Sequence, residues 1–200
     1  MQPFRFQQQF APLQFHSPTP TPLKWATVQF GDVVREVNLA ERNPCAAGLT
    51  RFVGLEHLAP EDLRVRSWGN LTDGTTFTRI FRAGQVLFGK RRAYQRKVAV
   101  PDFEGVCSGD IIVLEAKPAA PGKVSLLPGL LPYILQSEGF FQHALGTSAG
   151  SLSPRTKFKE LAKYQFKLPQ WVVEQERLTL ALTQTDEVQG CYYRGAKDTH

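Results

Sequence analysis

The residues with the clearest chemical potential form a cationic segment at positions 79–97. The segment contains Tyr94 and no acidic residue, and its seven basic residues are Arg79, Arg82, Lys90, Arg91, Arg92, Arg96 and Lys97. Lysine and arginine release the counterions condensed on phosphates, and arginine also forms paired hydrogen bonds with guanine. Because like charges repel, the segment predicts an anionic partner, and the aromatic residue within it favours nucleic acid. The alternative is a solvated loop that keeps the protein soluble.

A second basic segment, residues 155–167, carries five basic residues against one acidic residue, Glu160. Before it lie the small and hydroxyl residues 146–151, and Ser153-Pro154 is typical of a helix start, with serine as the N-cap and proline at the first position. Backbone donors ahead of a helix suit phosphate. The segment therefore predicts phosphate ligands, unless its lysines only line the outer face of an ordinary helix. The expected ligands are Ser148, Ser151, Arg155 and Lys157.

A nuclease-like pattern offers an alternative function. Pro101-Asp102 and, after twelve intervening residues, Glu115-Ala116-Lys117 resemble an arrangement in which two carboxylates hold Mg²⁺ and a lysine steadies the developing charge. However, Asp102 lies in a turn that starts with proline, and Lys117 directly precedes Pro118, where the strand should end. We keep a metal-dependent nuclease as the second hypothesis.

Other catalytic and cofactor motifs are absent from the sequence. It has no GxxxxGK[ST] loop, no GxGxxG after a strand, no HExxH and no Asn-Pro-Pro-aromatic signature of adenine methylation. The three cysteines, Cys45, Cys107 and Cys191, form no CxxC pair, which argues against a zinc site or a disulfide framework and fits a reducing cytoplasm. Beyond the nuclease-like pattern, the sequence therefore shows no catalytic motif, and we expect no cofactor.

Composition indicates one globular domain with appendages. The chain has 200 residues, is 42% hydrophobic and carries a formal net charge of +6. A chain of this size and composition can bury a proper core. It contains no run of 18 apolar residues, so we expect no membrane span, and the N-terminus lacks the apolar core of a secretory signal.

Short apolar runs broken by glycine and proline predict an α+β fold with a twisted, curved, barrel-like mixed sheet. Residues 25–30, 77–81, 85–89, 97–100 and 164–168 are expected strands, and the β-branched run 111–114 is an expected buried strand. Short helices are expected at residues 33–38, 130–136 and 139–145, and from Pro154 to about Lys163.

The two ends of the chain differ from this core. Residues 1–22 are rich in Gln, Phe and Pro and predict a flexible arm, followed by the domain at residues 23–169. Pro169 is expected to open a final helix at residues 170–190, before a tail at residues 191–200. Trp171, Leu178 and Leu182 share one helical face, with Gln175 off it, and a short helix needs a partner to bury such a face.

Several motifs in register resemble the target recognition domains of type I restriction–modification specificity subunits. They are residues 84–99 (GQVLFGKRRAYQRKVA), 103–115 (FEGVCSGDIIVLE), 131–135 (LPYIL), 148–155 (SAGSLSPR), and Leu168-Pro169 followed by Glu174-Gln175. The resemblance runs from about residue 23 to residue 182.

The resemblance implies sequence-specific recognition of double-stranded DNA without catalysis. Such subunits usually carry two recognition domains separated by long helices, and each domain reads half of a split target. Their partners are adenine-N6 methyltransferase subunits and an ATP-dependent restriction subunit, which perform the chemistry. This chain has one domain and one helix, so it resembles a half-subunit that forms a homodimer, or a component of a related phage-defence or DNA-modification complex.

On this hypothesis the two basic segments lie on opposite sides of a DNA-binding cleft. Arg91, Arg92 and Tyr94 are expected to read base edges, and Lys90, Arg96 and Lys97 to approach the DNA backbone or a groove. A third hypothesis is a non-catalytic adaptor whose basic surface meets an acidic protein.

Overall fold

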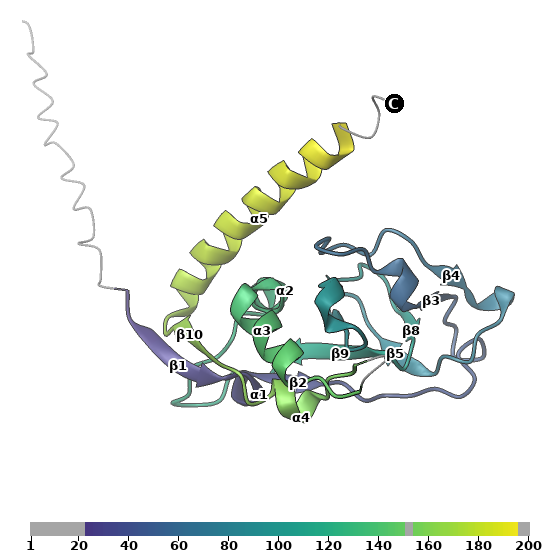
Figure 1. Ribbon diagram of the computed structural model, residues 1–200, viewed down its shortest axis with the longest axis horizontal. Coiled ribbons are helices and arrows are strands. Elements are labelled where there is room, and N and C mark those ends of the chain that lie inside the picture. Colours follow the sequence, from purple (N-terminus) through teal and green to yellow (C-terminus); the bar gives the residue numbers. More distant parts are fainter. Residues whose placement is uncertain (1–22, 151–153, 196–200) are drawn as a thin grey trace, which may run out of the picture.

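The computed structural model describes residues 23–150 and 154–195. The expected arm at residues 1–22 and residues 196–200 lie outside this part of the chain. Figure 1 shows a globular body from which the last helix projects. Among the described residues, no helix combines the length and apolar character that crossing a bilayer would require.

The strands form three sheets instead of the single sheet that the sequence predicted. A four-stranded antiparallel sheet has the order β2-β9-β6-β7, with bounds Val34–Glu36, Ile111–Ala116, Val86–Gly89 and Val98–Ala99. A four-stranded mixed sheet has the order β4-β3-β8-β5, with bounds Gly69–Asn70, Arg51–Val53, Gly105–Cys107 and Arg79–Phe81. β1 (Trp25–Gln29) pairs with β10 (Gln165–Pro169). The α+β class holds.

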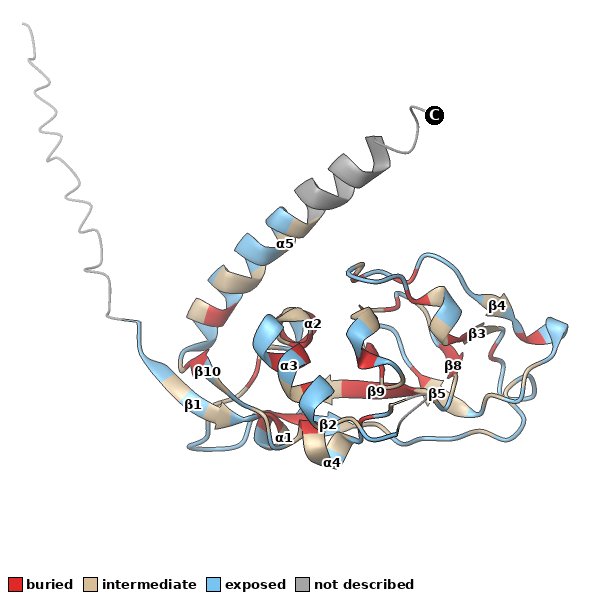
Figure 2. Cartoon of the chain, in the orientation of Figure 1, coloured by how far each residue is buried: buried red, intermediate tan, exposed pale blue. Residues whose placement is uncertain are grey.

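The strand β9 is the centre of the core, and its apolar run predicted this burial. Ile112 and Leu114 pack among residues of the helices, whereas Ile111 and Val113 pack against residues of the mixed sheet. Because successive side chains of a strand point to opposite faces, an all-apolar strand indicates that both faces are covered. Figure 2 shows β9 as buried along most of its length.

Two of the short helices cover the antiparallel sheet. α2 (Leu131–Gln136) and α3 (Glu138–Gly146) bear out the expected pair, and Ser137 caps α3 by accepting a hydrogen bond from the N–H of Phe140. Phe140 packs edge-on against Phe88 at 5.7 Å between ring centroids. The remaining helical elements are α1 (Phe30–Val33), α4 (Phe158–Leu161), α5 (Val172–Gly195), η1 (Leu55–His57), η2 (Leu71–Asp73), η3 (Ala93–Gln95) and η4 (Pro128–Leu130).

Three local expectations were wrong because long-range pairing overrides local propensity. The helix expected at residues 33–38 is replaced by α1 and by β2, which pairs with β9. The helix expected after Pro154 begins only at Phe158, since residues 154–156 bond to another segment. Pro169 ends β10 instead of opening the last helix, which starts at Val172 and continues to Gly195.

A fully buried amide fixes α5 to the globular body. Gln175 is 0% exposed; its Oε1 accepts from the N–H of Leu127 (2.7 Å), and its Nε2 donates to the carbonyls of Ser125 (2.8 Å) and Pro169 (2.9 Å). The sequence had placed Gln175 off the contact face, which was wrong. One turn later, Thr179 lies so close to Gly129 that a Cβ there would stand 2.9 Å from its methyl group.

We predict that Gln175→Met destabilises the protein by about 3 kcal/mol, because the similar shape is kept while one buried and two partly buried backbone groups lose their partner. Urea unfolding measures this change. Gln184→Met on the exposed surface of the same helix is the matched control and should leave the free energy of unfolding within about 0.5 kcal/mol. Equal effects of the two substitutions would contradict the anchoring role.

Candidate nucleic-acid interface

The loop between β6 and β7 carries most of the first basic segment in a fixed conformation. Arg92 and Arg96 stand on either side of η3, with φ angles of 53° and 50°. A left-handed backbone costs a residue with a Cβ on the order of 1 kcal/mol. The surrounding structure must therefore hold this loop in place, and hydrogen bonds to other segments do so.

The second basic segment is one of those holders. The N–H of Arg92 donates to the carbonyl of Pro154 (2.9 Å), and the N–H of Thr156 donates to the carbonyl of Lys90 (3.1 Å). Arg91 and Arg155 are therefore antiparallel neighbours. The expectation that the two segments face each other across a cleft was wrong, because they lie side by side and form one basic surface. We call residues 90–92 and 154–157 the joined basic segments.

A single carboxylate connects the joined basic segments. Asp110, in the turn between β8 and β9, accepts from Nε of Arg155 at 2.8 Å and from Nη1 of Arg91 at 3.4 Å, and its backbone carbonyl accepts from the N–H of Lys90 at 3.0 Å. The hydrogen bond from Arg155 holds the pKa of Asp110 below its ordinary value. Sequence reasoning missed this residue, since nothing in the turn Ser108-Gly109-Asp110 reveals its partners.

Besides Arg91 and Arg155, two more of the predicted DNA contacts, Arg96 and Lys97, have partners inside the molecule. Arg96 pairs with Glu138 and lies 4.8 Å above the ring of Phe141, and Nζ of Lys97 donates to the carbonyl of Leu55 at 2.6 Å. Lys90 is half-buried, and this burial lowers its pKa. These residues brace the β6–β7 loop against α3 and η1, a structural role that the sequence did not predict.

Other predicted contacts face solvent. Tyr94 is 56% exposed, and Arg92 and Lys157 are exposed as well. The side chain of Arg155 is half exposed, and because it bonds Asp110 through Nε, its two terminal nitrogens are left for another ligand. The outward-facing cations therefore come from both joined basic segments.

The expected phosphate-binding turn at residues 146–151 is altered by the structure. The hydroxyl of Ser148 donates to the carbonyl of Ala144 at 2.7 Å, so it closes the end of α3. The N–H groups of Thr147, Ser148 and Ala149 all donate to protein carbonyls, so the free donors that the sequence suggested are not available there. Ser151 lies outside the described residues.

Only part of the apolar face that was expected to contact a partner is exposed. Trp171 and Leu182 are 56% and 38% exposed, whereas Leu178 packs against the chain's own core. Further exposed apolar residues lie just before β1, at its first residue and along α5: Leu23, Trp25, Val172, Val173 and Leu180.

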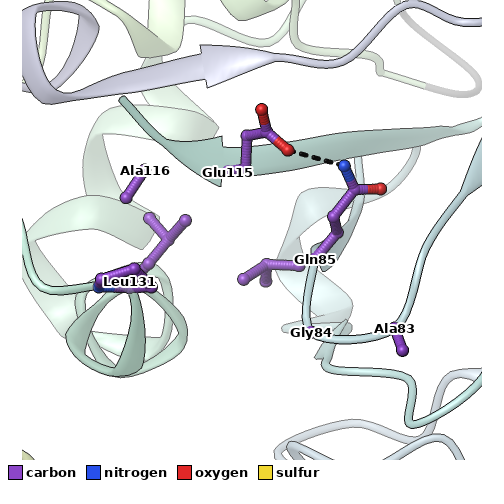
Figure 3. A pocket seen from close by; sticks show the side chains of 8 residues that line it. Ala83, Gly84, Gln85, Glu115, Ala116 and Leu131 are labelled. Atoms are coloured by element: carbon purple, nitrogen blue, oxygen red, sulfur yellow. Dashed lines mark hydrogen bonds between the residues drawn. The ribbon is translucent and has the colours of Figure 1, made fainter. Parts of the chain in front are cut away.

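Two residues of the nuclease-like pattern, Glu115 and Lys117, bond to other parts of the chain. Glu115 pairs with Arg35, and its Oε2 accepts from Nε2 of Gln85 at 2.7 Å, beside a pocket that Ala116 and Leu131 also line (Figure 3). Nζ of Lys117 donates to the carbonyl of Gly31. Within residues 23–150 and 154–195, no group of three or more His, Cys, Asp or Glu side chains is placed to hold a metal ion.

Comparisons with known proteins show which solved structures share this fold. No family model and no curated protein matches the sequence. A structure concerned with complex assembly and conformational transition of the type I R-M system matches 90% of this chain and 48% of its own, with 20% identity and a TM-score of 0.66. The HsdS subunit from Thermoanaerobacter tengcongensis matches 92% of this chain and 48% of its own, with 20% identity and a TM-score of 0.64.

A third solved structure is the S subunit of a type I restriction–modification system from M. genitalium, with 13% identity and a TM-score of 0.52 over 83% of this chain and 40% of that chain. The present chain thus spans about half the length of the structures that it matches. It has the fold of about half of a type I restriction–modification specificity subunit.

Proposed function

We propose that this chain is a sequence-specific recognition subunit for double-stranded DNA, acting in a type I restriction–modification complex or a related phage-defence or DNA-modification complex. The observation that carries the proposal is the likeness in fold, over about 90% of the chain, to solved specificity subunits. The chain performs no catalysis itself. It directs methyltransferase and restriction subunits to the target.

DNA binds, in this proposal, to the joined basic segments. Arg155 and Lys157 contact phosphates, and Arg91, Arg92 and Tyr94 read base edges. Phosphate contacts set the position of the protein, and base contacts set the sequence. Lys90, Arg96 and Lys97 act mainly by fixing the shape of the β6–β7 loop, as their internal partners suggest. The preformed loop keeps the entropic cost of binding low.

Assembly uses α5. The exposed Trp171 and Leu182 face either a second copy of the chain, which would restore a two-domain arrangement, or a methyltransferase subunit. Size-exclusion chromatography with light scattering tests this part of the proposal. A strict monomer that also fails to bind a methyltransferase subunit would contradict it.

We predict that selection from random duplex DNA enriches a defined sequence, and that two substitutions act differently on it. Arg92→Ala should cost about 1–3 kcal/mol on the selected site and relax one base position, because a base contact is lost. Lys157→Ala should weaken binding to all duplexes alike. It should also reduce the slope of log affinity against log salt concentration by about the value of one phosphate contact.

Lys123→Ala, at an exposed position outside the joined basic segments, is the control and should change neither property. If the protein binds no duplex even at low ionic strength, the proposal is wrong, and the result would support the hypothesis of an adaptor that binds an acidic protein. Mg²⁺-dependent nicking that Glu115→Ala abolishes would instead support the nuclease hypothesis.

We predict that Asp110→Asn lowers the free energy of unfolding at pH 7 by about 1–2 kcal/mol, because two arginines lose their shared carboxylate. The folded-state pKa of Asp110 is depressed, so its stabilisation is present above the ordinary aspartate pKa of about 3.9 and is lost as the pH falls through the folded value.

Urea unfolding of the wild-type protein and Asp110→Asn at several pH values measures this effect. The difference between the two proteins should be constant near neutrality and should shrink below about pH 4. Asp102→Asn, at an exposed position, is the control. A difference that does not change with pH would show that the Asp110 charge is not responsible.

A further inference from the structure

A stacked arginine lies on an inner strand of the mixed sheet and is not part of the joined basic segments. The guanidinium carbon of Arg51 is 4.3 Å from the ring centroid of Trp68 and 4.8 Å from that of Phe103, and the two rings are 5.1 Å apart. Arg51 begins β3, Trp68 directly precedes β4, and Phe103 lies shortly before β8. Three segments that are distant in sequence thus converge on one guanidinium.

The surroundings of Arg51 hold its side chain rigidly. Phe103 packs edge-on against the fully buried Phe81 at 5.7 Å. Gly105 lies against the backbone of Arg51, so that a Cβ at this position would be only 2.4 Å from the carbonyl oxygen of Arg51. A guanidinium is planar, and stacking on aromatic rings fixes the orientation of this plane, so its N–H groups are presented to a bidentate acceptor in one direction.

The electrostatic environment of Arg51 differs from that of other arginines in the molecule. Arg35, Arg79 and Arg155 each pair with a carboxylate. Within residues 23–150 and 154–195, the guanidinium of Arg51 has the two aromatic rings as its partners and no acidic side chain. Aromatic faces orient a cation without neutralising its charge or occupying its N–H groups. This half-buried cation is therefore prepared for an acceptor from outside the chain.

The distance to the joined basic segments suits one DNA duplex. β3 and β8 are parallel, and Gly105 of β8 lies against the backbone of Arg51. Asp110 follows Gly105 by five residues. At about 3.3 Å per residue, the chain between Gly105 and Asp110 spans at most about 17 Å. This is the length of about five base pairs, so the backbone at Arg51 and the backbone at Asp110 are separated by no more than the reach of one half of a split target.

We propose that Arg51, held by Trp68 and Phe103, is a base-reading residue that contacts the O6 and N7 atoms of one guanine in duplex DNA. The inference rests on the proposed function, and it assigns a specificity contact outside the two basic segments. Arginine in a fixed plane matches the paired acceptors on the guanine edge, whereas lysine provides the same charge without the planar pair of donors.

The test is Arg51→Lys, which keeps the charge and removes the planar donor pair. Binding is measured on the duplex selected by the wild-type protein, on its single-base variants and on an unrelated duplex. We expect a loss of about 10-fold to 100-fold on the selected duplex, tolerance of other bases at one G·C position, and affinity for the unrelated duplex within about twofold. Arg42→Lys, at an exposed position, is the matched control and should leave all three unchanged.

A second measurement uses the wild-type protein and therefore does not depend on how a variant folds. Replacing the guanine at the relaxed position by 7-deazaguanine removes the N7 acceptor. It should weaken wild-type binding by about tenfold and Arg51→Lys binding very little, since the contact is already lost. Trp68→Leu, which removes an aromatic face, should relax discrimination at the same position.

The outcomes separate this inference from the proposed function. If the wild-type protein selects a sequence and Arg51→Lys selects the same one with equal affinity, the base-reading role is wrong while the proposed function stands. A uniform loss on all duplexes would overturn base reading in favour of a phosphate contact. If the wild-type protein binds no duplex, both the inference and the proposed function fail.

Discussion

Repulsion between like charges is the constraint on which the basic surface of this molecule depends. Two cationic segments more than fifty residues apart lie side by side, joined by backbone hydrogen bonds at Lys90 and Arg92. Without an acid between them, Arg91 and Arg155 would repel each other. Asp110 accepts a hydrogen bond from both, so one carboxylate makes a dense positive surface compatible with a folded chain. The surface is therefore fixed before any ligand arrives.

This arrangement divides the cations into those that shape the surface and those that remain for a ligand. Arg96 and Lys97 hold the β6–β7 loop through Glu138 and the carbonyl of Leu55. Arg92 and Lys157 face solvent. If this surface binds DNA as proposed, it needs both classes, because the exposed contact residues are positioned by a backbone that the first class holds in place. A carboxylate orients Arg155, and aromatic rings orient Arg51.

The sequence predicted the elements whose signal is local and missed those that depend on distant partners. The buried strand at residues 111–114 and the helices α2 and α3 follow from apolar patterns within a few residues. β2 was mistaken for a helix because its partner, β9, lies about eighty residues away. The bracing role of Arg96 and Lys97 was invisible because each partner is 42 positions away. The buried position of Gln175 was missed because a polar side chain on a helix is expected at the surface, whereas this one makes three internal hydrogen bonds.

Amide hydrogen exchange with and without a selected duplex tests most directly whether the joined basic segments form one DNA-binding surface. The amides of residues 90–92 and 155–157 should gain protection together, at the same DNA concentration, while those of α5 are unchanged by DNA alone. Protection confined to one of these segments, or found only outside both, would contradict a single surface held together by Asp110.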